Sequence, residues 1–187
     1  LALSQMQSPA GAKNMPAVIV PRKAVSELRK LLDEEPQEVD IKLSDTRAEF
    51  SVGDIRLTTK LIDGSFPDYK RVIPVGNDKI ISVDADLLSA AVDRVSTIAS
   101  DKSRAIKLNI SAGQIVLSAT NPDASSATEI LEITYAGEPI DIGFNARYLM
   151  DILSQIQGET IAIELADSGS PSLLRDPKDD ANIFVLM

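Results

Sequence analysis

Apolar side chains along the chain recur in a pattern that predicts three helices, each preceded by a short apolar strand. The strands cover residues 17–20, 80–83 and 140–144. A residue that favours a helix start follows each strand, namely Pro21, Asp84 and Asn145. Counted from the last residue of each strand, apolar or aromatic residues stand at the fourth, fifth, eighth and twelfth positions in all three copies. This spacing predicts one apolar stripe on each helix, in the same register three times.

Alternating apolar and polar residues after each helix predict short antiparallel strands. They cover residues 39–43, 48–52 and 55–59 in the first copy, 106–110, 115–119 and 130–135 in the second, and 160–165, 172–175 and 182–186 in the third. Turn signals, Gly53 with Asp54 and Ala112 with Gly113, separate neighbouring strands. The repeated unit is a strand, a helix and a meander of strands, with a period of about 60 residues. The predicted fold class is therefore α+β with antiparallel sheets.

Three copies of such a unit predict an uneven domain organisation. One unit has an apolar helix face and an apolar sheet face, and packing these two faces together gives only a thin core. Two units are therefore expected to pair into one domain. Residues 75–187 hold one full pair and residues 1–74 hold the latter half of another pair, with residues 74–78 as the linker. We expect a further half to precede this chain.

The composition excludes several chemistries. The chain has 187 residues with no Cys and no His, which excludes a disulfide framework, a Cys/His zinc site, a Ser-His-Asp triad and a histidine general base. The 28 acidic residues leave a carboxylate metal site or an acid–base pair open. Asp84 and Asp86 could form such a pair, but they stand at a helix start, where acids cap the helix and favour its dipole. No cofactor and no metal are expected.

The net charge of −9 argues against a conventional nucleic-acid binder, which is usually basic overall. Residues 21–33 differ from the rest, because four basic residues there oppose only two acids. From the sequence alone, the simplest interpretation of these charges is a solvated helix face. The first residues lack the basic and apolar regions of a signal peptide, and no run of about 18 apolar residues is present. A cytoplasmic protein is expected.

Three segments resemble the bacterial sliding clamps, the family of DNA polymerase III beta subunits. They are residues 18–23 (VIVPRK), residues 60–69 (KLIDGSFPDY) and residues 142–145 (IGFN) together with Tyr148. The resemblance extends from end to end of the chain. It implies a three-domain subunit built from pairs of the repeated unit. This chain would hold the latter half of the middle domain (1–74) and nearly all of the C-terminal domain (75–187), while the N-terminal domain would be absent from it.

The resemblance implies a DNA-clamp fold and a function without catalysis. Two full-length subunits would join head to tail into a homodimeric ring, with helices inside around duplex DNA and antiparallel sheets outside. Such a processivity factor tethers the replicative polymerase, the clamp loader and repair proteins during DNA replication in the bacterial cytoplasm. The DNA-facing residues implied here are Arg22, Lys23, Arg29, Lys30, Lys102 and Arg104. Their contacts would address phosphates, independently of base sequence, and would weaken with salt.

The resemblance also implies a cleft into which partner proteins insert a short peptide with apolar anchors. Matching positions here are Leu1, Pro67, Arg71, Val72, Ser103, Asn145, Tyr148, Gly169, Pro171, Val185, Leu186 and Met187. Apolar walls would desolvate a leucine or phenylalanine anchor, and Asn145 and Arg71 would orient the peptide. From periodicity alone, Val72, Leu186 and Tyr148 are expected to be core residues instead.

The subunit interface implied by the resemblance includes Thr97 and Ile98, with Glu129 in an ion-pair fringe. Without the first domain the chain is expected to be monomeric or weakly associated, because it cannot close a ring. The alternative that the residues leave open is a carboxylate-based hydrolase or a sugar-binding β-rich module. That alternative requires two acids close together in one pocket, with perturbed pKa values.

Overall fold

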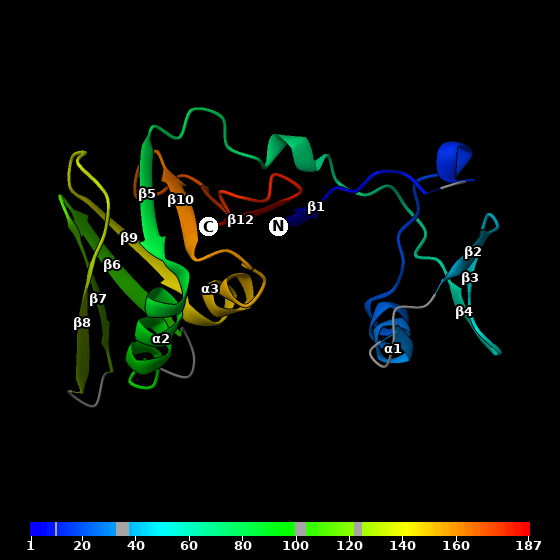
Figure 1. Cartoon of the computed structure of the whole chain (residues 1–187), viewed down its shortest axis with the longest axis horizontal. Helices are drawn as coiled ribbons and strands as arrows, with labels where there is room; N and C mark the ends of the chain where they lie inside the picture. Colours follow the sequence, from blue (N-terminus) through cyan, green and yellow to red (C-terminus); the bar gives the residue numbers. More distant parts are fainter. Residues whose placement is uncertain (10, 33–37, 100–103, 122–124) are drawn as a thin grey trace. The chain divides into compact units, whose positions relative to one another are not determined.

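The computed structural model describes residues 1–9, 11–32, 38–99, 104–121 and 125–187 (Figure 1). They form two compact units. The larger unit comprises Leu1–Met6 and Asp68–Met187, and the smaller unit comprises Gln7–Pro67. The first residues belong to the larger unit because β1 (Ala2–Ser4) pairs with the last strand, β12 (Asn182–Leu186). The division therefore differs from the one expected at residue 74.

The described residues of the larger unit form two antiparallel sheets and two α-helices. One sheet has the strand order β1-β12-β11-β10-β5, in which β11 is Ser172–Arg175, β10 is Thr160–Leu165 and β5 is Lys79–Asp84. The other sheet has the order β8-β7-β6-β9, in which β8 is Ser126–Glu132, β7 is Gln114–Thr120, β6 is Ala105–Ser111 and β9 is Ile140–Asn145. Helices α2 (Ala85–Ser96) and α3 (Ala146–Leu153) pack against each other (Figure 1). The α+β class with antiparallel sheets is confirmed.

The two repeated units within this part of the chain exchange strands. Strand β5 precedes α2 in the sequence but pairs with β10, which follows α3. Strand β9 precedes α3 but pairs with β6, which follows α2. Buried residues meet at both joints, for example Ile81 opposite Ile163 and Leu108 opposite Ile142. Because each of the two repeats completes the sheet of the other, both repeats of the larger unit share one continuous hydrophobic core.

Side-chain caps fix the start of both helices where the sequence predicts them. The Oδ1 atom of Asp84 accepts a hydrogen bond of 2.8 Å from the backbone N–H of Leu87. The Oδ1 atom of Asn145 accepts from the N–H groups of Arg147 (3.0 Å) and Tyr148 (3.4 Å). These bonds satisfy donors that a helix start leaves without partners. Asp84 is thus a cap, and none of the described residues groups into a cluster that could hold a metal.

In α2 and α3, three of the four positions of the predicted apolar stripe (the fifth, eighth and twelfth) lie in or against the core, and one is wrong. The fifth and eighth positions of α2 and α3 are buried, with Leu88 and Leu149 fully enclosed. The fourth position is exposed instead, since Leu87 is 58% and Tyr148 is 57% accessible. Each of these helices packs against a sheet on one side and against the other helix on another side. The fourth position then faces solvent. Tyr148 is therefore available for binding rather than part of the core.

In the smaller unit, the described residues place one α-helix on a three-stranded sheet. Helix α1 (Arg22–Leu32) lies beside β3 (Arg47–Val52) and β4 (Ile55–Lys60), and β2 (Asp40–Leu43) completes the sheet order β2-β3-β4. A short 3₁₀ turn, η1 (Ala12–Asn14), precedes them. Of the residues of α1, only Ala24 is buried. Val25, whose counterparts Leu88 and Leu149 are enclosed, is 52% accessible here, because no second helix lies beside α1 in the described part of this unit.

Isolated β-bridges and strand limits refine the predicted meanders. Residues 17–20 form no strand, but Ile19 makes a single bridge to Ile62. Ser82, at the matching position of the next repeat, makes the same kind of bridge to Thr134.

Strand β8 ends at Glu132 and begins well before the predicted limit of residue 130. None of the helices in the described residues is long and apolar enough to cross a membrane.

Asp176 is a buried carboxylate that holds two turns of the larger unit together. Its two oxygens accept the backbone N–H groups of Gly158 at 2.7 Å and of Lys178 at 2.9 Å. The N–H of Lys178 is the main reason that the pKa of Asp176 lies below its ordinary value of 3.8. A depressed pKa in the folded state stabilises the fold above the unfolded-state pKa, and this stability is lost as the pH falls through the folded-state value.

Asp176→Asn is therefore expected to flatten the acid dependence of stability. The measurement is urea unfolding of wild type and variant at pH values from 7 down to about 3. The wild type should be more stable at neutral pH, and the difference should shrink towards acid. Asp180→Asn, an exposed change in the same turn, is the control and should keep the wild-type profile. A constant difference at all pH values would contradict the role given to the Asp176 charge.

Candidate functional site

A mostly apolar pocket of about 270 Å³ lies in the larger unit between α3 and the paired strands β1 and β12. Its lining residues are Leu1, Ala2, Tyr148, Asp151, Ile152, Phe184, Val185 and Leu186. Four of these, Leu1, Tyr148, Val185 and Leu186, are among the residues that the sequence singles out for a peptide cleft. The structure brings these four together from three distant segments of the chain.

Helix α3 forms one wall of the pocket. The Asn145 cap fixes the first turn of α3, and Tyr148 in that turn exposes its ring to solvent. Asp151 and Ile152 follow one turn later and line the same pocket. Asp151 is not among the predicted cleft residues, and Ile152 is predicted only as a core residue. Their spacing of three and four residues from Tyr148 places them on the same helix face, which is the signal that could have found them.

Strands β1 and β12 form the opposite wall. The N–H of Val185 donates to the carbonyl of Leu1 at 2.8 Å, and the N–H of Gln5 donates to the carbonyl of Ala181 at 2.8 Å. Ala2 lies opposite Phe184 in this register. The added strand thus places Leu1 and Ala2 next to the buried residues Phe184 and Val185. Strand addition of this kind is set by backbone pairing, so a sequence pattern does not identify Ala2 or Phe184 as pocket residues.

Most of the remaining predicted cleft residues do not line this pocket. Arg71 ends the 3₁₀ turn η2 (Tyr69–Arg71) in an ion pair of 3.2 Å with Asp68, and its side chain is exposed. Val72 and Met187 are exposed as well. Pro67 belongs to the smaller unit, and Ser103 lies outside the described residues. These positions stay predictions.

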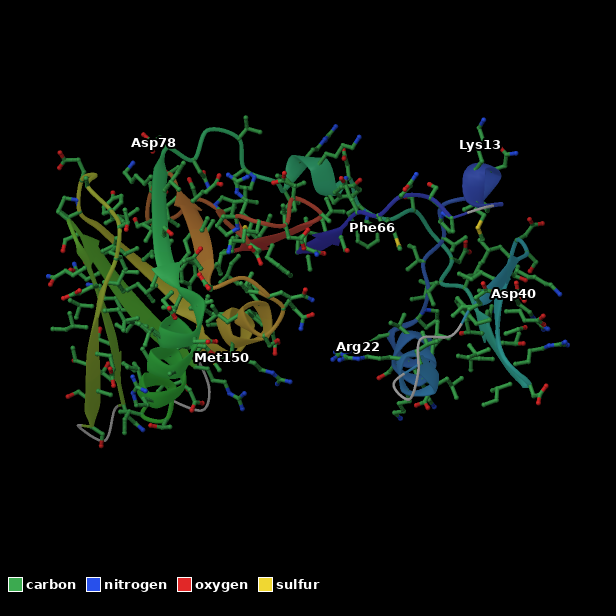
Figure 2. The ribbon with its side chains drawn as sticks, viewed as in Figure 1. Lys13, Arg22, Asp40, Phe66, Asp78 and Met150 are labelled. Atoms are coloured by element: carbon green, nitrogen blue, oxygen red, sulfur yellow. The ribbon has the colours of Figure 1, made fainter. Side chains whose placement is uncertain are left out.

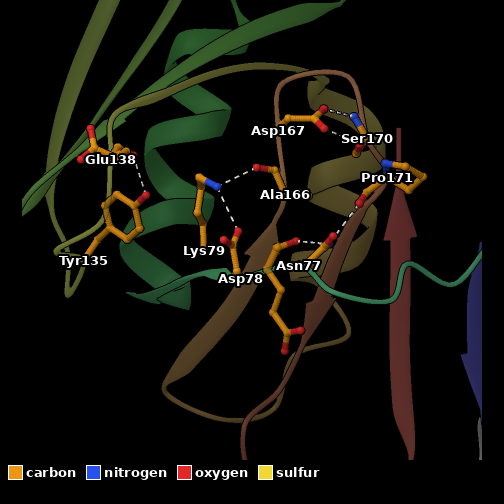
Figure 3. A network of polar contacts seen from close by, with 10 residues as sticks. Asn77, Asp78, Lys79, Tyr135, Glu138, Ala166, Asp167, Ser170 and Pro171 are labelled. Atoms are coloured by element: carbon orange, nitrogen blue, oxygen red, sulfur yellow. Dashed lines mark hydrogen bonds and ion pairs between the residues drawn. The ribbon is translucent and has the colours of Figure 1, made fainter.

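Gly169 and Pro171 lie in a tightly bonded turn between β10 and β11 (Figure 3). The Oδ1 atom of Asp167 accepts the N–H groups of Gly169 (2.8 Å) and Ser170 (2.7 Å). The Ser170 hydroxyl also donates to this carboxylate. This hydrogen bond is the main cause of the lowered pKa of Asp167. Pro171 precedes Ser172, which lies opposite the pocket residue Leu186. The turn therefore adjoins the strand end that carries the pocket, but it does not line it.

Two side chains just before and at the start of β5 fasten this turn (Figure 3). The Nδ2 atom of Asn77 donates to the carbonyls of Glu164 (2.8 Å) and Pro171 (3.1 Å). The Nζ atom of Lys79 donates to the carbonyl of Ala166 at 2.8 Å and pairs with Asp78 at 2.9 Å. Sequence reasoning treated residues 74–78 only as a linker. The structure shows that Asn77 ties this linker to the sheet.

Helix α1 of the smaller unit carries the basic side chains predicted to face DNA. Arg22, Lys23, Arg29 and Lys30 are all exposed, and Figure 2 shows Arg22 extending away from the helix. Lys30 pairs with Glu27 at 3.0 Å, which partly offsets its charge. Arg104, in the larger unit, is exposed and has a φ of 46°, whereas Lys102 lies outside the described residues. The exposure of these residues fits either a solvated face or phosphate contacts.

The residues predicted for a subunit interface gather around Arg94 of α2. The Nε atom of Arg94 lies 2.7 Å from Oε1 of Glu129 on β8, and its Nη2 atom donates to Oε2 at 3.2 Å. This paired guanidinium lowers the pKa of Glu129. The carbonyl of Arg94 accepts the hydroxyl of Thr97 at 2.7 Å, and Ile98 follows half-buried. Sequence reasoning assigned no role to Arg94, which the structure shows to be the partner of Glu129.

The acidic residues of the described chain do not form the pair that a hydrolase would need. The pKa is lowered in the carboxyl groups of Asp78, Glu129, Asp141, Asp167 and Asp176. The causes are hydrogen-bond donors and cations rather than a second acid. A general acid requires a raised pKa instead. No observation on the described residues favours the hydrolase or sugar-binding alternative.

Comparison with protein families matches the whole chain in two parts. Residues 1–68 match the model described as "DNA polymerase III beta subunit, central domain", and residues 70–187 match the "DNA polymerase III beta subunit, C-terminal domain". The Beta sliding clamp of Caulobacter vibrioides is 48% identical over 187 residues, which are 100% of this chain and 50% of that protein. The one from Escherichia coli is 39% identical over 173 residues, which are 91% of this chain and 47% of that protein.

Solved structures agree with the sequence comparison. A DnaN sliding clamp from Bartonella birtlesii bound to griselimycin has a TM-score of 0.95 and 49% identity, over 100% of this chain and 50% of that one. A C. crescentus beta sliding clamp with PEG bound to a putative beta-motif tethering region has a TM-score of 0.95 and 47% identity, with the same coverage. The chain therefore spans about half the length of the curated relatives it matches.

Proposed function

The chain belongs to the DNA polymerase III beta subunit family, the sliding clamps, and we propose that it acts as part of a processivity factor. The complete protein would encircle duplex DNA as a homodimeric ring and tether the replicative polymerase and repair proteins, without catalysis of its own. The observation that carries the proposal is the pocket between α3 and the β1–β12 pair, together with the two family matches. We place this activity in the bacterial cytoplasm, where replication takes place.

The proposed domain organisation is that of the same family. The smaller unit corresponds to the latter half of a middle domain, and the larger unit corresponds to a C-terminal domain. The family-model limits, which meet at residues 68 and 70, and the compact units, which divide between Pro67 and Asp68, both support a boundary in this region. The proposed boundary therefore moves from residue 74 to this point.

The pocket is proposed to receive an apolar anchor of a partner peptide, including peptides of the polymerase and the clamp loader. Tyr148, Leu1 and Ile152 offer apolar surface, and Val185 and Leu186 close the floor. Burial of a leucine or phenylalanine side chain in such a pocket is favourable because it removes apolar area from water. The ordered turn around Gly169 and Pro171, with Arg71 and Met187, is proposed to contact the flanking residues of the peptide.

The proposal is tested by titrating a labelled peptide of the Q-L-x-L-F kind into the 187-residue chain. Fluorescence anisotropy should rise to saturation, and unlabelled peptide should compete. A peptide of the same length, in which the leucines and the phenylalanine are replaced by serine, should not bind. Absence of saturable binding by the first peptide, with the chain shown to be folded by circular dichroism, would contradict the proposed function.

Phosphate contacts by α1 give a second test, on DNA. In a full-length clamp that carries these residues, Arg22→Ala together with Lys23→Ala is expected to weaken the retention of linear DNA at low salt. The slope of log affinity against log salt should fall by about 2, because each lost phosphate contact removes about 0.9. Electrophoretic mobility shifts over a salt series measure this slope.

The matched control removes two cations from the sheet of the same unit. Lys42 and Arg56 are exposed and both lie near Glu49, at 4.0 and 3.6 Å. The double change Lys42→Ala and Arg56→Ala should leave the salt slope nearly unchanged. Equal effects of both double variants would show that overall charge, rather than α1, controls DNA binding.

The interface proposal concerns Thr97, Ile98 and Glu129 at one end of α2 and on β8. In a complete ring they would meet the first domain of a second subunit. Glu129 already pairs with Arg94 in the chain itself, so we propose that the Arg94–Glu129 pair as a whole, rather than Glu129 alone, belongs to the polar fringe.

A further inference from the structure

One charged side chain stands in the apolar pocket. Among the described residues that line it, Asp151 alone carries a charged side chain, and it lies one turn after Tyr148 on α3. Its neighbours in the lining are aliphatic or aromatic side chains. A carboxylate at this place is not needed to build the wall, since the buried residue Ile152 next to it already packs against the core.

The carboxylate of Asp151 has no partner in the described part of the chain. No ion pair or hydrogen bond of its side chain occurs there, and only its backbone carbonyl is used, as acceptor for the Ser154 hydroxyl at 2.8 Å. Arg147 stands one turn earlier on the same helix, but it does not line the pocket. Among the described residues, the charge is therefore left to water and to whatever enters the pocket.

The other two repeats show that the helix itself does not require a free acid here. The position that matches Asp151 is Ala90 in α2 and Glu27 in α1. Glu27 is neutralised by Lys30 at 3.0 Å, and alanine carries no charge. Among these three matching positions, only the one in α3, the helix that lines this pocket, holds an acid without a partner in the described residues, and Asp151 is exposed there.

We propose that Asp151 selects partner peptides that carry a lysine or arginine next to their apolar anchor. This inference rests on the proposed peptide-binding function and adds a charge preference to it. A peptide that covers the pocket removes water from the carboxylate, which is unfavourable unless a cation or donor replaces that water. An acidic residue at the same place adds repulsion. The peptide's cation reaches Asp151 at the edge of the pocket, while its anchor fills the apolar part.

The test uses labelled peptides with one leucine and one phenylalanine anchor and blocked ends. A single Lys, Gln or Glu is moved through the positions next to the anchors, and binding to the 187-residue chain is followed by anisotropy. At the best position, the lysine peptide is expected to bind about threefold to tenfold more tightly than the glutamate peptide at low salt. The difference should shrink at high salt, because the pair is partly exposed.

Three variants assign this preference to Asp151. Asp151→Asn should remove the difference between the lysine and glutamate peptides, and Asp151→Lys should reverse it. Asp93→Asn, the same charge change at an exposed position of α2 outside the pocket, should keep the wild-type preference. Circular dichroism shows whether each variant is folded. The glutamine peptide measures the binding affinity when the varied side chain carries no charge.

The outcomes separate this inference from the function on which it rests. If peptides bind but wild type does not distinguish lysine from glutamate, or if Asp151→Asn keeps the preference, the role of Asp151 is overturned and peptide binding stands. If none of the peptides binds to the folded wild type, the proposed peptide-binding function fails, and this inference fails with it.

Discussion

Tyr148→Ala is expected to weaken binding of the Q-L-x-L-F peptide by about tenfold or more. Tyr148 is 57% accessible, stands in the first turn of α3 and lines the pocket with its ring. Aromatic residues of this kind are frequent hot spots, because they offer a large rigid apolar surface to the partner at a small entropic cost. Loss of more than about 1.4 kcal/mol corresponds to the expected tenfold change.

The same exposure that makes Tyr148 useful for binding makes its removal harmless to the fold. The melting temperature and urea midpoint of the variant are expected to stay near those of wild type, since substitutions at exposed positions change stability by about 0.5 kcal/mol or less. Anisotropy titration measures affinity, and thermal unfolding by circular dichroism measures stability. An unchanged affinity, or a loss of affinity that only follows a loss of folded protein, would refute the assignment.

Leu87→Ala is the matched control, because the repeat places Leu87 at the position of Tyr148. Leu87 is 58% accessible and is not among the residues that line the pocket. Its replacement should change neither peptide affinity nor stability to a comparable extent. The comparison isolates the pocket from the general effect of truncating an exposed side chain on a first helical turn.

Leu88→Ala is expected to lower the free energy of unfolding of the larger unit by about 2–5 kcal/mol, the range for removal of a buried leucine side chain. Leu88 lies on α2 and is fully enclosed in the core that both repeats share. The substitution leaves a cavity that close-packed neighbours cannot fill. Urea unfolding followed by circular dichroism measures the change.

The strand exchange adds a second expectation to this experiment. Because β5 completes the sheet of the second repeat and β9 completes that of the first, both repeats should lose structure in one cooperative step. Leu87→Ala, one residue earlier and exposed, should alter stability by about 0.5 kcal/mol or less. Similar losses for both leucines would contradict the buried position given to Leu88. Two separate transitions within the larger unit would show that the repeats do not share one core.

Local patterns account for what could be predicted. The prediction of caps at Asp84 and Asn145 is correct because a helix start is governed by the residue that bonds to the next few N–H groups. The hairpin turns at Gly53 and Gly113 are also predicted correctly, since both glycines have a positive φ that other residues rarely adopt. Strand limits are less accurate, as β8 shows, because neighbouring strands rather than local sequence decide where pairing ends.

The candidate site could be predicted only through the residues that match a family motif. Tyr148 and Val185 could be named in advance, but periodicity alone would have placed Tyr148 in the core. Asp151 could have been found through its helical spacing from Tyr148, whereas Ala2 and Phe184 could not be assigned, because their role depends on which strand adds to β12. These are contacts between segments far apart in the chain.

The repeated helix followed by a meander of strands, the helix caps, and the lack of histidine and cysteine can all be read from the amino-acid sequence. Each of these depends on residues that are close neighbours in the chain or on residue types alone. By contrast, the exchange of β5 and β9, the addition of β1 to β12, and the pocket that contains Asp151 are seen only in the folded structure. Strand pairing is made by backbone groups that nearly every residue carries, so the choice of partner strand depends on the packing of the whole core.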